Sequence, residues 1–354
     1  MKTLTVWAAF LCASVLYPQE VRNARPDTAD SGPIESVLLV AAGDLLLGAR
    51  AEPVIRSCGA DAPFDSVRSI LQSADIALAN LEAPFAESGQ GVPYPKQYNF
   101  RVPPEFAGGL VAAGFHVLTL ANNHVLDYGP EGLRSTLHIL DSLNVGRCGA
   151  GLTLEEAHRP LVLERRGMRF GFLAYSLTYP DSFWAAPGRP GTAFPESARM
   201  RRCIRGLKDS TDFVIVSFHW GGEKLHTPKT YQRSHAHRAV DAGADLVIGH
   251  HPHVVQGIEI YRNTPIAYSL GNFIFGSYSP DASGALLEVE FHPGGALSAR
   301  IVPIHVNNYD VRFQPRILRN REKSDMIRHI NAISEHLNAG AAVLNAAGTV
   351  RIPP

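Results

Sequence analysis

Side chains that bind metals well follow five apolar segments of the sequence, at the point where each segment ends. These side chains are Asp44, Glu82 with Asn80, Asn123 with His124, His219, and His251 with His253. Imidazole, carboxylate and amide groups without a thiolate are typical of a hydrolytic or Lewis-acid metal centre rather than of a structural zinc site. Such a centre polarises a carbonyl or phosphoryl oxygen, or lowers the pKa of a bound water.

Each segment taken alone also has an ordinary structural interpretation. Asp44 follows Gly43 as an aspartate does in a simple turn, and Asn80 or Asn123 is the kind of residue that caps a helix. The segment 250–253 holds three histidines in four residues, for which the alternative is a solvated turn. The recurrence of these groups at five segment ends favours a shared metal site.

Short apolar runs bounded by turn residues predict the buried strands that would position these groups. We expect strands at 36–42, 76–79, 117–120, 213–218, 246–248, 265–268, 285–291 and 299–304, a hairpin over 161–175, and helices at 65–73, 104–113, 130–143, 197–208, 231–242 and 326–337. This order predicts an α/β domain in which parallel strands with crossover helices are joined to antiparallel strands. Ligands gather outside the carboxyl ends of such strands, so the five ends should meet if the strands share one sheet.

The composition is that of an ordinary globular protein. The 354 residues include 33 Lys plus Arg and 33 Asp plus Glu, so the formal net charge is zero. This balance argues against a nucleic-acid partner, because such proteins carry a basic surface. Four cysteines without a CxxC pair exclude a zinc ribbon and leave at most one disulfide beyond Cys12.

The N-terminal segment has the features of an export signal. A basic start and an apolar run over 4–17 are too short for a normal membrane-spanning helix, which needs roughly 20 residues. We therefore expect residues 1–17 to be a signal peptide or anchor, 18–33 a linker, 34–340 the folded domain and 341–354 a C-terminal tail. The protein is expected to be exported or associated with the cell envelope; the alternative is a cytoplasmic protein with a frayed first helix.

Six spaced motifs carry a resemblance to a known family. They are Val40–Asp44, Ala79–Glu82, Leu120–His124 with Asp127–Gly129, Phe218–Gly221, Gly249–His253 and Tyr268–Phe273. In this order they resemble the CapA-type poly-γ-glutamate capsule synthesis proteins over about residues 36–303. That family is similar in turn to the calcineurin-like metallophosphoesterases. The resemblance implies an α/β fold, a metallophosphoesterase-like β-sandwich of two mixed sheets flanked by helices.

The resemblance also implies roles for the residues that match its motifs. Asp44, Asn123, His219, His251 and His253 would be metal ligands, with Glu82 or Asn80 at the bridging position. His124 would be the acid that faces the leaving group. The phosphoesterase motif Asp-x-His has Leu46 in place of its histidine, so one or two divalent ions are expected, with manganese, iron and zinc not distinguished.

Four neighbouring residues have a functional and an ordinary interpretation. Asp127 would orient the imidazole of His124, or would be a turn residue before Gly129. Glu223 would be a base or a substrate contact, or a solvated carboxylate. Arg101 would bind a carboxylate or phosphate of the substrate, whereas Lys96 is expected to be a solvated charge.

Three functions are compatible with these residues. The resemblance favours a metal-dependent enzyme or enzyme-like factor that acts on poly-γ-glutamate or a related peptide, with membrane proteins of capsule synthesis as possible partners. A metal-dependent phosphoesterase is the second hypothesis, and the loss of the histidine at Leu46 counts against it. The third is a non-catalytic assembly factor in which the metal is structural.

Overall fold

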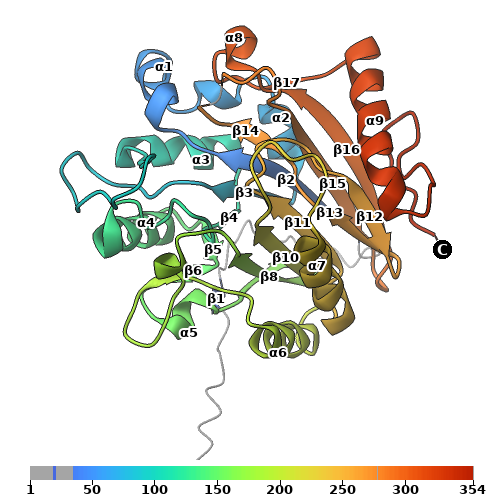
Figure 1. The fold of residues 1–354 in the computed structure, drawn as a ribbon, viewed down its shortest axis with the longest axis horizontal. Coiled ribbons are helices and arrows are strands. Elements are labelled where there is room, and N and C mark those ends of the chain that lie inside the picture. The colour runs from blue at the N-terminus through green and yellow to red at the C-terminus, as the bar shows by residue number, and fades with distance from the viewer. Residues whose placement is uncertain (1–18, 21–34, 277, 354) are drawn as a thin grey trace, which may run out of the picture.

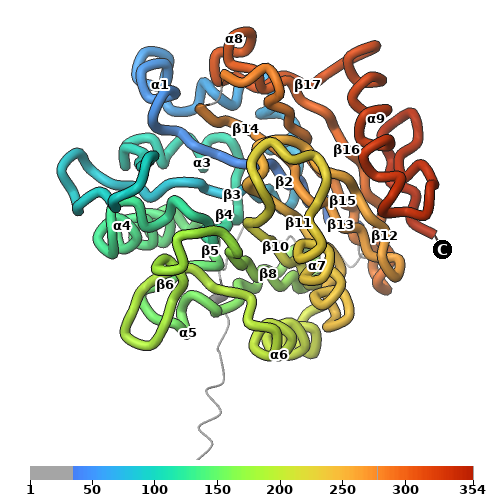
Figure 2. The backbone as a smooth tube through the Cα atoms, viewed as in Figure 1, coloured from blue at the N-terminus to red at the C-terminus, as the bar shows by residue number. Residues whose placement is uncertain are grey.

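The strands of the chain form two large sheets that pack against each other, with helices on their outer faces (Figure 1). The computed structural model describes residues 19–20, 35–276 and 278–353. The backbone trace in Figure 2 shows the N-terminal half of the domain at one sheet and the middle of the chain at the other. The C-terminal segment then returns to the first sheet through β15 and β16.

The first sheet has the order β17-β16-β15-β2-β3-β4-β5, with β14 added beside β2. Its strands β2, β3, β4 and β5 are parallel, and β15, β16 and β17 continue it in antiparallel pairing. The bounds are β2 Val37–Leu45, β3 Ile76–Leu81, β4 Val117–Thr119, β5 Gly146–Cys148, β14 Asn272–Ile274, β15 Gly284–Phe291, β16 Leu297–His305 and β17 Arg316–Ile317.

The second sheet has the order β1-β7-β8-β10-β11-β13-β12. Strands β8, β10, β11 and β13 are parallel, while β7 and β12 pair with the sheet in antiparallel fashion. The bounds are β1 Gln19–Glu20, β7 Leu161–Arg165, β8 Met168–Ser176, β10 Phe213–His219, β11 Leu246–His250, β12 Ile258–Tyr261 and β13 Thr264–Ala267. A two-stranded ribbon of β6 (Ala150–Gly151) and β9 (Gly191–Thr192) lies outside both sheets.

Helices cover the outer face of each sheet. The first sheet is covered by α1 (Glu52–Cys58), α2 (Arg68–Ser73), α3 (Ala107–Ala113) and α4 (Gly129–Ser142), and the second by α6 (Ser197–Lys208) and α7 (Thr230–Ala242). The terminal helix α9 (Asn320–Ser334) packs against β12 and β16. Single helical turns are α5 (Leu154–Ala157) and α8 (Asn308–Val311), and 3₁₀ turns lie at Ala49–Ala51, Ala62–Phe64, Pro104–Phe106, Asp181–Phe183 and Glu335–Leu337.

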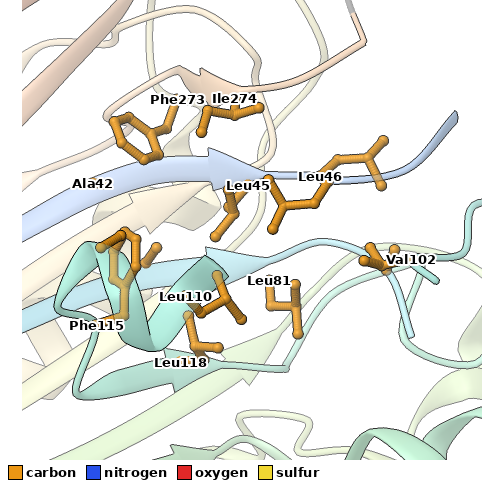
Figure 3. Packing of buried hydrophobic residues seen from close by; sticks show 14 of the residues in the cluster. Ala42, Leu45, Leu46, Leu81, Val102, Leu110, Phe115, Leu118, Phe273 and Ile274 are labelled. Atoms are coloured by element: carbon orange, nitrogen blue, oxygen red, sulfur yellow. The ribbon is translucent and has the colours of Figure 1, made fainter. Parts of the chain in front are cut away.

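The alternation of side chains along β2 explains why the sequence predicts a buried strand there. Val37, Leu39 and Ala41 lie in the core between the two sheets. Val40 and Ala42 belong instead to the cluster under the helices, which Figure 3 shows with Leu110 and Phe273. Because both faces of the strand are buried, its residues from Val37 to Ala42 are apolar without interruption.

The expectation of two mixed sheets flanked by helices is confirmed, but the strand ends do not share one sheet. Strands β2, β3 and β4 belong to the first sheet, whereas β10 and β11 belong to the second. The sequence periodicity reports which residues are buried and does not report which strands pair. The carboxyl ends therefore meet across the interface between two sheets rather than along one sheet edge.

The chain ends differ from expectation in two places. Gln19–Glu20, expected in a linker, forms β1 at the edge of the second sheet, where the free backbone groups of β7 accept another strand. The expected tail after residue 340 packs on the domain, with Val343, Leu344 and Val350 buried in the core between the sheets. The expected signal segment 1–17 lies outside the described residues. Among the described residues, no helix has the length and apolar character that crossing a bilayer requires.

Candidate metal centre

Two groups of side chains in the described part of the chain have the spacing of a metal site. One group is Glu82, His219 and His251, and the other is Asp44, Glu82 and His253. Within each group the ligand atoms lie within 4.8 Å of one another. Glu82 belongs to both groups, so it occupies the position between two possible ions. Glu82 and Asn80 were both expected as candidates for this bridging position, and Glu82 is the carboxylate common to the two groups.

The donor atoms of these groups fit a divalent metal. Oε1 of Glu82 and Nδ1 of His251 are buried and have no hydrogen-bond partner among the described residues. Unpaired buried polar atoms are costly, and a cation that accepts their lone pairs removes this cost. The mixture of carboxylate and imidazole donors without a thiolate is suited to manganese, iron or zinc.

The protonation states of these groups also favour metal binding. Burial lowers the pKa of His251 to about 3 and lowers the pKa of His219 well below its usual value. Burial opposes ionisation of Asp44, but contacts from His250 and His253 hold the pKa of this carboxyl well below its usual range. Neutral imidazoles beside an ionised carboxylate are the forms that coordinate a metal.

Glu82 has the opposite shift. Burial, and then repulsion from Asp44, raise the pKa of Glu82 well above its usual value. Two carboxylates that share a buried site cannot both ionise cheaply unless a cation lies between them. A cation between Asp44 and Glu82 would therefore stabilise the ionised forms of both carboxylates.

Asn80 acts on the candidate ligands through its amide. Its nitrogen donates to Oδ1 of Asp44 at 2.9 Å and lies 3.3 Å from Nδ1 of His219. Its oxygen accepts a hydrogen bond from Asn122 at 3.1 Å. Asn80 thus links side chains of both sheets and contacts a carboxylate and an imidazole of the candidate ligands.

The backbone after β11 presents two histidines to the site. His251 and His253 have φ values of 96° and 57°, a left-handed conformation that residues other than glycine rarely adopt. The amide of His251 donates to Oδ2 of Asp44 at 3.1 Å, which ties this turn to the end of β2. His250, the last residue of β11, has a buried imidazole whose Nδ1 lies 3.5 Å from Oδ1 of Asp44.

Asn123 reaches the site from the segment after β4. Its side-chain oxygen lies 2.7 Å from Nε2 of His219. The adjacent Asn122 is buried, and its oxygen accepts the backbone amide of His124 at 3.0 Å. The two asparagines therefore hold this turn in place, and Asn123 is brought to the same group as Glu82 and His219.

His124 and Asp127 form a hydrogen-bonded pair at the edge of the candidate ligands. Nδ1 of His124 lies 2.7 Å from Oδ2 of Asp127. An ionised carboxylate only accepts, so Nδ1 carries the proton in this bond and Nε2 is left for other partners. The ring of Phe100 packs on that of His124 with centroids 4.3 Å apart. Burial lowers the pKa of His124, against the opposite effect of Asp127.

Lys96 is not the solvated charge that the sequence indicates. Its ammonium lies 2.5 Å from Oδ1 of Asp127 and donates to the backbone oxygen of Asn123 at 2.5 Å. Burial lowers the pKa of Lys96, and the ion pair with Asp127 opposes this shift. A lysine in a polar loop rich in glycine and proline carries no periodicity that could indicate burial, so the expectation failed here.

The remaining predicted residues lie further from the ligands. Glu223 is exposed on the loop after β10, and its charge contributes to the raised pKa of Glu82. Arg101 donates to the backbone oxygen of Ala86 at 3.3 Å, and no contact with the candidate ligands is found among the described residues. Asn272 belongs to the motif Tyr268–Phe273 but was not predicted as a site residue, and its side-chain oxygen lies 3.0 Å from Nδ1 of His253. Its position in a Gly-Asn-Phe motif after a predicted strand is the sequence feature that could have indicated a role in the site.

Comparison with known proteins identifies related sequences. The sequence profile of the family described as "Bacterial capsule synthesis protein PGA_cap" matches residues 38–277. The PGA biosynthesis protein CapA of Bacillus subtilis is 32% identical over 267 residues, which are 75% of this chain and 70% of that protein. The capsule biosynthesis protein CapA of Bacillus anthracis is 28% identical over 279 residues, 77% of this chain and 68% of that protein.

Solved structures with a similar arrangement are more distant. The NAD nucleotidase of Haemophilus influenzae matches with a TM-score of 0.46 and 14% identity, over 78% of this chain and 51% of that one. A calcineurin-like phosphoesterase from Bacillus subtilis matches with a TM-score of 0.45 and 14% identity, over 85% of this chain and 98% of that one.

Proposed function

The chain belongs to the PGA_cap family of bacterial capsule synthesis proteins, and we propose that it is a metal-dependent enzyme of capsule synthesis that acts on poly-γ-glutamate or a related peptide. The names of the Bacillus relatives support the substrate class, since both are capsule or PGA biosynthesis proteins. We place its action in the cell envelope, because a basic start and a short apolar run open the sequence.

The observation that carries the enzymatic part of the proposal is the juxtaposition of a shared carboxylate and a proton donor. Glu82 belongs to both groups of candidate ligands and contacts His219. Asn123 contacts the same imidazole of His219. His124, which is hydrogen-bonded to Asp127, follows Asn123 directly in the chain. A structural metal site is closed by its ligands and has no need for an oriented imidazole next to it. A metal site with an adjacent proton donor, here the ligand groups with His124, supplies the Lewis acid and the general acid that catalyse hydrolysis of an amide or ester.

The ligand groups, His124 and Asp127 would have different roles in the reaction. The two ligand groups, with Asn123, would hold one or two divalent ions, which polarise the substrate carbonyl and acidify a water when bound. Asp127 holds Nδ1 of His124, so the imidazole keeps one orientation and one tautomer. In hydrolysis of a γ-glutamyl amide, water adds its oxygen to the carbonyl carbon and the carbon–nitrogen bond breaks. His124 in its protonated form then gives a proton from Nε2 to the leaving nitrogen and recovers one from the attacking water.

The experiment is a hydrolysis assay on the purified full chain reconstituted with Mn²⁺, Fe²⁺ or Zn²⁺. Poly-γ-glutamate of defined length is the substrate, and new amino termini and chain length are measured. We expect turnover that is lost on chelation and that falls by about 100- to 10,000-fold in His124→Gln. The matched control is His138→Gln, which changes an exposed histidine on α4 and should retain full activity.

Two outcomes would overturn this proposal in different ways. Cleavage of an aryl phosphate but not of poly-γ-glutamate, with the same dependence on His124, would identify a phosphoesterase. Stoichiometric metal without any turnover, together with a large loss of thermal stability on chelation, would identify an assembly factor in which the metal is structural.

A further inference from the structure

We infer that Lys96 is a positioning residue, whose half-buried ammonium holds Asp127 and the backbone of Asn123 so that His124 faces the metal groups in one orientation. The inference deepens the proposed function, because it assigns the group that orients the proton donor. It depends on the geometry of the loop over residues 94–100, which lies outside the six spaced motifs of the sequence.

Both oxygens of the Asp127 carboxylate contact neighbouring groups. Oδ1 lies 2.5 Å from the ammonium of Lys96. Oδ2 accepts from Nδ1 of His124 at 2.7 Å and from the backbone amide of Phe100 at 2.6 Å. The side chain of Asp127 is fully buried, and a buried polar oxygen without a partner is costly. Removal of Lys96 would leave one oxygen of a buried carboxylate without its cation.

The ammonium of Lys96 also lies 3.2 Å from Nδ1 of His124, and a further contact of the ammonium reaches the metal groups. It donates to the backbone oxygen of Asn123 at 2.5 Å, and the side-chain oxygen of the same asparagine lies 2.7 Å from His219. One cation therefore fixes both the carboxylate that orients His124 and the turn that presents Asn123. Lysine suits this place because its three donors can serve acceptors in different directions.

The loop that carries Lys96 is itself anchored on both sides. The backbone amide of Tyr94 donates to the backbone oxygen of Asp127 at 2.9 Å. The side-chain hydroxyl of Tyr94 lies 2.8 Å from the hydroxyl of Ser182. The ammonium of Lys96 lies 5.2 Å from the ring centre of Phe183, in the same turn as Ser182. The loop thus has a fixed position, and Lys96 is inserted from it rather than resting on the surface.

The test compares three variants in the full chain loaded with Zn²⁺, a diamagnetic ion. Lys96→Met removes the ammonium and keeps most of the apolar stem, and Lys96→Arg keeps the charge. Lys323→Met on α9 is the control for loss of a lysine far from the site. The first readout is the Nδ1 proton resonance of His124 in protein with ¹⁵N-labelled histidine, assigned by its absence in His124→Gln.

We expect this proton to be observable and slowly exchanging in the wild type and in Lys323→Met. In Lys96→Met it should broaden or disappear, and Lys96→Arg should restore it at least in part. Hydrolysis of poly-γ-glutamate should fall by about 10- to 100-fold in Lys96→Met, mainly in kcat. In an Asp127→Asn background, Lys96→Met should cost less than it does in the wild type, because the two residues act through one contact.

An unchanged His124 resonance in folded Lys96→Met would overturn the inference, whether or not the protein is active. Near-ultraviolet circular dichroism establishes that the variant is folded. If Lys96→Met does not fold, Lys96→Arg takes its place in the test. Loss of the His124 resonance in folded Lys96→Arg would contradict a role for the positive charge. If no substrate is turned over, the proposed function fails while the resonance still tests the contact between Lys96, Asp127 and His124.

Discussion

Nε2 of His219 lies 3.4 Å from Oε1 of Glu82, and this contact joins the end of β10 in one sheet to the residue after β3 in the other. The two residues are 137 positions apart in the sequence. Because each sheet contributes a part of the ligand set, the site exists only when the sheets are packed together. The metal groups therefore depend on the core that packs the two sheets together.

Glu82→Gln should abolish metal binding by both ligand groups, since Glu82 is the carboxylate that they share. Asp44→Asn should impair only the group that contains His253, and His219→Gln only the group that contains His251. Elemental mass spectrometry after reconstitution measures the metal content per chain. Retention of the wild-type metal content in Glu82→Gln would contradict the shared position of this carboxylate.

The same substitution should stabilise the protein without metal. Burial and repulsion from Asp44 raise the pKa of Glu82, so its ionised form destabilises the apo fold. The sign follows from the raised pKa: the contribution of Glu82 to stability is present at low pH and is lost as the pH rises through the folded-state pKa. Urea unfolding of chelated protein at pH 8 should therefore give a higher midpoint for Glu82→Gln than for the wild type.

Gly43→Ala should weaken both the fold and the site. A Cβ at Gly43 would lie 2.1 Å from the backbone oxygen of Gly271, where the amide of Asp44 forms its hydrogen bond at 2.9 Å. The end of β2 and the segment that leads into β14 must then move apart, and this movement displaces Asp44. We expect a loss of about 2 kcal/mol or more in the free energy of unfolding and weaker metal binding. Gly108→Ala on α3 is the matched control, since a Cβ there meets nothing within 4 Å.

Much of this arrangement could be predicted from the sequence because local patterns dictate it. The apolar run before each ligand predicts a buried strand, and α6 begins and ends where its helical periodicity does, at Ser197–Lys208. The placement of ligands at strand ends follows from the direction of parallel strands. These features need no knowledge of how distant segments pack.

The features that could not be predicted depend on long-range packing. Which strands share a sheet is decided by pairing across large sequence distances, so the division of the ligands between two sheets was not visible. Lys96 and Asp127 are 31 positions apart, and their contact depends on where the loop over 94–100 folds back. Short strands such as β14 were also missed, because three residues do not show a period.

Leu46→His should not restore a phosphoesterase-like ligand. Leu46 is fully buried among apolar residues under the helices, close to Ile274 (Figure 3). An imidazole there has no polar partner in its surroundings, and we expect it to cost about 2–4 kcal/mol in the free energy of unfolding. Urea unfolding and metal content check this, with Leu46→Met as the control that should cost less than about 1.5 kcal/mol. A gain in bound metal would contradict the placement of this side chain.

The pH dependence of stability should include a contribution from His158, a buried histidine outside the metal site. Burial lowers its pKa to about 4, and its Nδ1 has no hydrogen-bond partner among the described residues. Because the folded-state pKa is below the usual 6.5, the contribution is complete above pH 6.5 and is lost as the pH falls toward 4. Between pH 7.5 and pH 5 the wild type should lose about 2 kcal/mol more than His158→Phe, whose ring does not titrate. Urea unfolding of both proteins across this range measures the difference, and parallel curves would show that His158 takes up its proton in the folded protein as readily as in the unfolded chain.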